Sequence, residues 1–173
     1  MPGLVMLGSH AVGWTGWRRL WTVGKFRKAR RLLRPVVEQS VIALPADLDA
    51  GRLLDAVRQQ FISLQAAWDA ADRSTLGALT TPQMLDEICA HFPPEGSPPN
   101  RTDVLSVQAR LLGFDDLESA WLATIEFSGM IRESPDRDAT PFCELWLLTR
   151  ECQTPSGASI GAPWRLARQQ ALL

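Results

Sequence analysis

The spacing of apolar residues changes once along this chain, near residue 100, and the two halves predict different elements. Residues 49–92 repeat apolar side chains every three or four positions, the spacing of helices with one buried face. Residues 103–112 and 121–128 alternate apolar with polar side chains, the spacing of strands with one buried face. Helices that precede strands in this way predict an α+β domain, in which helices cover one face of a curved four-stranded antiparallel sheet.

Local signals mark the ends of the predicted helices. Asp47 or Asp49 can accept a hydrogen bond from the first amides of a long helix, which is expected to break at residues 72–74. Thr81 and Pro82 begin another helix, because threonine caps the amides and proline has no N–H to leave unpaired at the first helical position. Two main helices joined by a short turn are therefore expected before the strands.

Large apolar side chains on the long helix and on the strands fall on the faces that are predicted to meet. They can fill the core, as such residues usually do, or line a pocket for an acyl chain or a partner's side chain. A buried tryptophan also needs a partner for its indole N–H, so it marks a specific environment. The candidate pocket residues are Phe61, Leu64, Trp68, Trp121, Phe127 and Trp146.

Charge divides the chain at a different place from the apolar spacing. Residues 1–37 contain eight basic residues and no acidic residue, although the whole chain has a net charge of −1. The rest of the chain contains the other ten basic residues and all 19 acidic residues, so its net charge is −9. This asymmetry predicts an N-terminal arm that meets an anionic surface, joined to a body with a different role.

Aromatic residues are interleaved with the charges of this arm, and residues 14–34 are expected to form two short amphipathic helical pieces. Each basic residue near an anionic membrane contributes up to ~1 kcal/mol, and aromatic rings are favoured at the headgroup boundary. Nucleic acid offers the same phosphates and stacks on the same rings, so it is the alternative partner, and a targeting segment is also left open. The predicted membrane-binding residues are Trp14, Trp17, Arg18, Arg19, Trp21, Lys25, Phe26, Arg27, Lys28, Arg30, Arg31 and Arg34.

No pattern of residues predicts catalysis, a metal or a cofactor. Cys89, Cys143 and Cys152 are widely spaced and form no CxxC pair, which argues against a disulfide framework or a zinc site. Tyrosine is absent, and His10 and His91 lie in the arm and near a loop, so a dyad of histidine and carboxylate is hard to assemble. We therefore predict no catalytic residue, no metal ion and no cofactor.

Two carboxylates, Glu126 and Glu144, fall on neighbouring predicted strands. Arg132 and Arg150 lie close to them in sequence, and opposite charges attract across a strand ladder. We expect ordinary cross-strand ion pairs at these positions. An enzyme of this fold is thus the least favoured class of function.

Five segments occur in an order and at spacings that resemble one protein family, the Tim44-like domain family, over roughly residues 48–170. The resemblance implies a cone-shaped fold like that of nuclear transport factor two, with helices and a curved sheet around an apolar pocket. It also implies a peripheral or tethered role at an inner membrane, and no catalysis. The segments are QQFISLQAAWDAADRSTLGALTTPQMLDEI, NRTDVLSVQARLL, FSGMIRE, PFCELWLLTR and WRLARQQ.

The sequence also departs from this family. Bacterial members usually begin with a signal sequence, a glycine-rich linker and a membrane span, whereas the uncharged stretch 1–17 is shorter than the ~20 apolar residues of a span. Mitochondrial members have a helical region that binds the chaperone, with no counterpart in this sequence. An import-motor role is therefore not expected, and the arm is the candidate replacement for the span.

Together these patterns predict a basic arm over residues 1–46 and a Tim44-like domain over residues 47–173. We expect a non-catalytic module, peripheral on the cytoplasmic side of an inner membrane. The arm is expected to bind anionic lipid, and the domain to present an apolar pocket to an unidentified protein or lipid partner. The alternatives are a ribosome- or RNA-associated adaptor of the same fold and, less favoured, a small-ligand enzyme.

Overall fold

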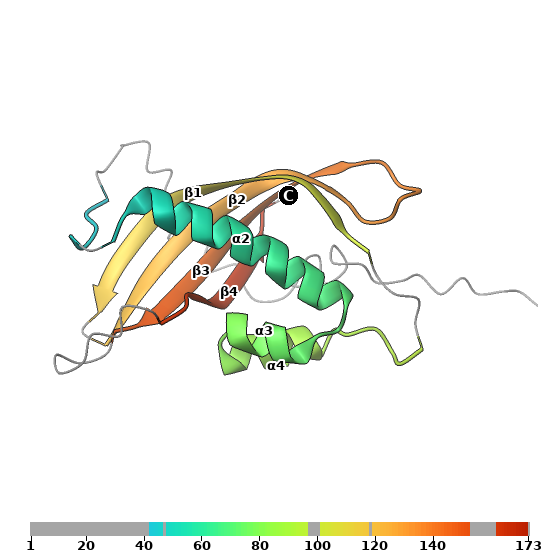
Figure 1. Ribbon diagram of the computed structural model, residues 1–173, viewed down its shortest axis with the longest axis horizontal. Helices are drawn as coiled ribbons and strands as arrows, with labels where there is room; N and C mark the ends of the chain where they lie inside the picture. The colour runs from blue at the N-terminus through green and yellow to red at the C-terminus, as the bar shows by residue number, and fades with distance from the viewer. Residues whose placement is uncertain (1–41, 47, 97–100, 118, 153–161, 173) are drawn as a thin grey trace, which may run out of the picture.

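The computed structural model describes residues 42–46, 48–96, 101–117, 119–152 and 162–172. Within these residues three helices precede four strands. Figure 1 shows their arrangement, and the predicted α+β architecture is confirmed. The elements are α2 (Ala50–Asp69), α3 (Arg73–Leu79), α4 (Pro82–Cys89), β1 (Asp103–Leu117), β2 (Ala120–Arg132), β3 (Thr140–Glu151) and β4 (Arg165–Ala171).

Side-chain caps fix the starts of all three helices. The Asp49 carboxylate accepts a hydrogen bond from the Arg52 amide at 2.7 Å, which starts α2 where the sequence predicted. Asp72 caps α3 in the same way, and Thr81 caps α4 with Pro82 directly after it. The region expected as a short turn is therefore a helix of its own.

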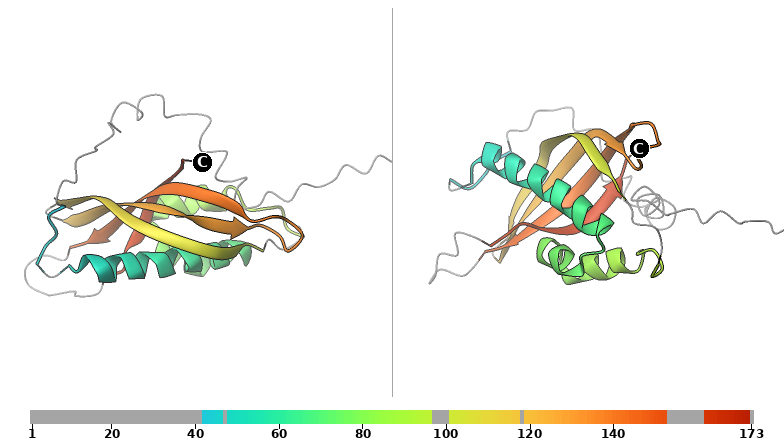
Figure 2. Two further views of the ribbon diagram at one scale, coloured as in Figure 1. Left: turned by 90° about the horizontal axis from the view of Figure 1, so that it is seen from above. Right: turned by 45° about the vertical axis from the view of Figure 1, so that its right-hand side comes forward.

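The four strands form one antiparallel sheet in the order β1-β2-β3-β4. Register shifts interrupt β1 at Val104/Ser106 and at Leu111/Gly113, and β4 opposite Leu147/Leu148. Such bulges bend a strand and increase its twist. The sheet is accordingly twisted in both views of Figure 2, and α2 crosses one face of it.

Aromatic rings fill the space between α2 and the sheet. The ring of Phe61 on α2 stacks on Phe127, Phe142 and Trp146, with centroid distances of 5.1, 5.1 and 5.2 Å. All four side chains are at most 3% exposed. Stacked aromatic pairs stabilise a core beyond the area that they bury, so this cluster fixes α2 on the sheet.

One buried amide ties the helices to the last strand. Gln60 on α2 donates to the carbonyl oxygens of Leu79, at 3.1 Å, and Trp164, at 2.9 Å. Next to it, the Thr81 amide donates to the Leu166 carbonyl at 2.9 Å. The α3–α4 pair is thereby held beside β4, where Figure 1 shows it.

Candidate functional site

Five of the six candidate pocket residues lie in the core. Phe61, Leu64, Trp68, Phe127 and Trp146 are each at most 2% exposed. The rings of Phe61, Phe127 and Trp146 contact one another, with Phe127 and Trp146 centroids 4.7 Å apart. These side chains pack as core, and a role as the lining of a ligand pocket stays a prediction.

The sixth candidate, Trp121, is half-buried near the start of β2. Its ring contacts Phe114, with centroids 5.8 Å apart, and the Arg150 guanidinium lies over it at 5.4 Å from the centroid. The predicted membrane-binding residues all fall within residues 14–34, outside the described part of the chain. Lipid binding by the arm therefore also stays a prediction.

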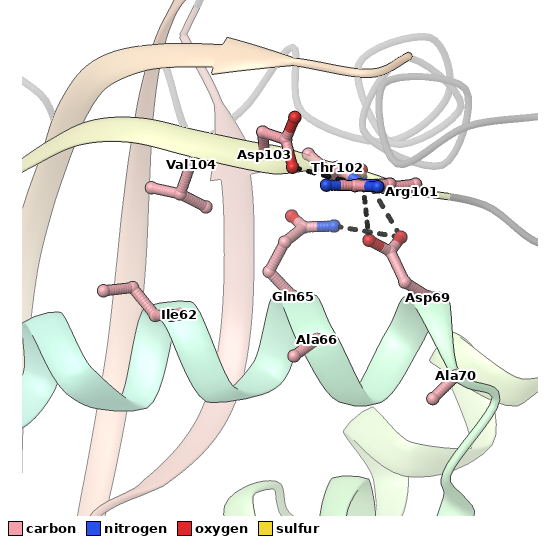
Figure 3. A pocket seen from close by; sticks show the side chains of 9 residues that line it. All are labelled: Ile62, Gln65, Ala66, Asp69, Ala70, Arg101, Thr102, Asp103 and Val104. Atoms are coloured by element: carbon pink, nitrogen blue, oxygen red, sulfur yellow. Dashed lines mark hydrogen bonds and ion pairs between the residues drawn. The ribbon is translucent and has the colours of Figure 1, made fainter. Parts of the chain in front are cut away.

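An open groove lies where the C-terminal end of α2 meets the start of β1, with a volume of about 550 Å³ (Figure 3). A volume of a few hundred Å³ is enough to hold a ligand or a side chain of a partner. None of the predicted pocket residues takes part in it. The lining residues are Ile62, Gln65, Ala66, Asp69, Ala70, Arg101, Thr102, Asp103 and Val104.

Asp69, the last residue of α2, joins the two walls of this groove. One carboxylate oxygen accepts from the Thr102 amide at 2.6 Å, and the other accepts from the Thr102 hydroxyl at 3.4 Å and from the Gln65 amide at 3.5 Å. Burial raises the pKa of Asp69 above its ordinary value; these hydrogen bonds oppose the rise, and the negative charge of Asp103 adds to it. The ionised carboxylate is thus incompletely compensated.

Two further polar groups face the same groove. Gln65 is 2% exposed, and its side-chain oxygen accepts no hydrogen bond from the described residues. Asp103 accepts from the Arg101 guanidinium at 3.3 Å, in an exposed ion pair. The groove therefore offers two carboxylates beside an apolar wall that contains Ile62, with the buried Gln65 side chain in its lining.

The sequence held part of the signal for this groove. Gln65 and Asp69 are four residues apart on a predicted helix, so they were bound to share a face. Their partner Thr102 is 33 residues away from Asp69, beyond two more helices and a loop. The contact between Asp69 and Thr102 depends on the position at which β1 begins, and the apolar periodicity of the sequence does not specify this position.

Glu144, for which a cross-strand ion pair was predicted, lies in the core. It is fully buried, and its carboxylate accepts from the Trp146 indole at 3.1 Å and from the Gln169 side chain. The period of two in β3 places Glu144 between Phe142 and Trp146 on the inner face. That alternation is readable in the sequence, although glutamate is rarely buried in proteins.

Glu126 does form a cross-strand ion pair, but with a different arginine from those predicted. Its carboxylate lies 3.0 Å from the Arg110 guanidinium, and Arg110 is its direct partner across the β1–β2 ladder. The pair is on the outer face of the sheet, with the arginine side chain 69% exposed. Exposed pairs of this kind contribute little to stability, and nothing in the pair suggests catalysis.

The described residues contain neither a metal-binding cluster nor a membrane-spanning helix. Within them, no group of three or more histidine, cysteine, aspartate or glutamate side chains is placed to hold a metal ion. No helix there is both long enough and apolar enough to cross a membrane.

An aromatic core lies between one long helix and a four-stranded antiparallel sheet, and a polar groove lies at its edge. This arrangement defines a two-layer α+β domain. Comparison with protein families matches residues 36–171 to the Tim44-like domain, so this chain belongs to that family. No curated protein matches the chain. The predicted family is confirmed, and family membership fits a membrane-associated tether module.

The match begins at residue 36, before the predicted start of the domain at residue 47. Residues 36–41 lie outside the described part of the chain, so the division into arm and domain stays a prediction. Peripheral association with a membrane agrees with the family.

Proposed function

We propose that this protein is a peripheral tether on the cytoplasmic side of an inner membrane. Its basic arm binds anionic lipid, and its Tim44-like domain presents a binding surface to a protein or lipid partner. One observation carries this proposal: the same chain contains a Tim44-like domain, matched over residues 36–171, and a first segment of 37 residues with eight basic and no acidic residues.

Electrostatic and apolar terms both favour binding of the arm to lipid. Basic residues near an anionic leaflet contribute up to about 1 kcal/mol each, so eight of them supply several kcal/mol before screening. Screening acts over a Debye length of about 8 Å, which makes the binding dependent on salt. The rings of Trp14, Trp17 and Trp21 add insertion at the headgroup boundary.

The aromatic core is the proposed site for an acyl chain or a partner's side chain. Phe61, Phe127 and Trp146 pack ring against ring, so such a guest enters only where these rings separate. Binding of a lipid should therefore change the chemical shifts of these ring protons in NMR spectra. A lipid with a dodecyl chain can serve as the probe. If it changes the chemical shifts of surface residues only, the apolar interior has no binding role.

Co-sedimentation of the whole protein with vesicles tests the arm. The variant R27Q/R30Q/R34Q should lose most of its binding to anionic vesicles, because three charges leave the membrane-facing segment. The matched control R52Q/R110Q/R137Q removes the same charge from exposed positions of the domain and should lose much less binding, because those charges lie outside the arm. Equal losses in the two variants would contradict a specific role of the arm.

The alternative partner, nucleic acid, is tested in the same assay. Stoichiometric RNA added at physiological salt should leave the protein on the vesicles if lipid is the preferred partner. Displacement by RNA would favour the ribosome- or RNA-associated adaptor instead, since arginine neutralises either kind of phosphate.

A further inference from the structure

The groove between α2 and β1 is lined by two carboxylates and a single guanidinium, so its charged groups sum to −1. Its acceptors are the carboxylates of Asp69 and Asp103 and the buried side-chain oxygen of Gln65, which accepts nothing from the described residues. The Arg101 guanidinium pairs with Asp103 at 3.3 Å, whereas Asp69 receives hydrogen bonds only from uncharged groups among the described residues. A buried acceptor that is left without a partner costs free energy, so a donor in this groove would be stabilised.

The electrostatics of Asp69 point the same way. Its carboxylate has lost part of its hydration, and Asp103 adds a second negative charge beside it. The Thr102 and Gln65 dipoles compensate for this only in part. A cationic donor would complete the compensation, because an opposite charge within about 4–6 Å favours the ionised carboxylate.

The shape of the groove suits a long basic side chain. Ile62 is 39% exposed and, with Ala66 and Val104, lines an apolar wall beside the acidic end. Arginine and lysine lay their aliphatic stems along apolar surface and keep the charged head among polar groups. In Figure 3 Ile62 and Asp69 lie at different ends of the groove, and Asp103 lies on the β1 side between them.

The chain itself carries a segment with matching charge. Residues 1–37 hold eight basic residues and no acidic residue, against a charge of −9 on the remainder. Arg34 is 16 residues before Ala50, and a linker of that length can span roughly 50 Å when extended. Because α2 is about 30 Å long, the arm can reach the groove at its far end.

We infer that this groove binds a basic side chain from residues 14–34 of the same chain, as an intramolecular docking site for the arm. The acceptors that hold the basic head are the carboxylates of Asp69 and Asp103. This site is separate from the lipid role of the arm, and its existence does not depend on that role.

The distribution of lysine makes a direct test available. The only two lysines of the chain, Lys25 and Lys28, both lie in the arm. Every lysine–carboxylate cross-link made by a zero-length carbodiimide therefore includes a residue of the arm. We expect mass spectrometry of the cross-linked monomer, without lipid, to find Lys25 or Lys28 joined mainly to Asp69 or Asp103. Links spread evenly over exposed carboxylates such as Asp115 and Asp116, or found only in covalent dimers, would overturn the inference.

A thermal double-mutant cycle in the whole protein provides a second measurement. If the arm docks, R27Q/R30Q/R34Q lowers Tm in the unmodified background but has no further effect in D69N/D103N. The control background D115N/D116N removes the same charge at the other end of β1, so there the full fall in Tm should remain. Additive effects in D69N/D103N, or equal coupling in both backgrounds, would refute docking even if the arm binds vesicles.

Discussion

Replacing Gly129 by alanine should destabilise the sheet strongly. Gly129 lies on β2, opposite Val107 of β1 and Phe142 of β3. A β-carbon added there would lie 2.8 Å from the Ser106 carbonyl carbon and 3.0 Å from the Phe142 ring, and closer still to the Ser106 carbonyl oxygen. Ordinary contacts of a β-carbon are 3.4–4 Å, so the backbone of β1 has to move at its first bulge.

The cost follows from what must move. Overpacking alone typically costs about 1–3 kcal/mol, and each ladder hydrogen bond that is weakened adds about 1 kcal/mol. We therefore expect Gly129→Ala to lower the free energy of unfolding by about 3–4 kcal/mol and Tm by roughly 10 °C. Urea unfolding followed by circular dichroism measures the first quantity, and calorimetry the second.

Gly113 provides a matched control on the same pair of strands. A β-carbon there would meet only Thr124 atoms at 3.8 Å, an ordinary contact. Gly113→Ala should thus change stability by less than about 0.5 kcal/mol, or raise it slightly by restricting the unfolded chain. If the two substitutions had the same effect, close approach of β1 would not be the reason for glycine at position 129.

Three further substitutions probe the polar groups. Glu144→Ala removes the acceptor of two buried donors, on Trp146 and Gln169, and should lower the free energy of unfolding by about 3 kcal/mol in urea, more than Glu144→Gln; a neutral result would contradict the buried contacts. Thr81→Ala removes the cap of α4 and should cost about 1 kcal/mol, whereas Thr81→Ser should retain most of it. Asp69→Asn tests the raised pKa of Asp69, because ionisation of this carboxyl group disfavours the folded state as pH rises through that pKa. The free energy of unfolding of the asparagine variant, relative to that of the native protein, should therefore increase from pH 4 to 7. A decrease would refute the raised pKa.

Local interactions made much of the fold predictable from the sequence. The caps at Asp49 and Thr81 act within three residues of the chain, and the helical and strand periods each report one buried face. The end of β1 was harder to predict, because the bulge at Leu111/Gly113 breaks the alternation and makes residue 112 look like a terminus. The strand in fact continues to Leu117 on the same ladder.

Contacts between distant segments were not predictable in the same way. Asp69 and Thr102 bring α2 and β1 together across 33 residues, and neither residue type indicates the other. Glu144 shows the opposite situation, since its position was readable from the period of β3 but its burial contradicts the average behaviour of glutamate. Its carboxylate accepts hydrogen bonds from two buried donors, the Trp146 indole and the Gln169 amide, which offset part of the cost of burying it.

If groove and membrane both bind the arm, they compete for it, and the competition has a measurable sign. If only a fraction of the molecules has the arm free of the groove, the apparent Kd for vesicles equals the intrinsic Kd divided by that fraction. D69N/D103N should therefore tighten binding to anionic vesicles beyond the gain from removing two negative charges, and D115N/D116N measures that electrostatic gain alone. Equal tightening in both variants, or tightening in neither, would mean that the groove does not hold the arm.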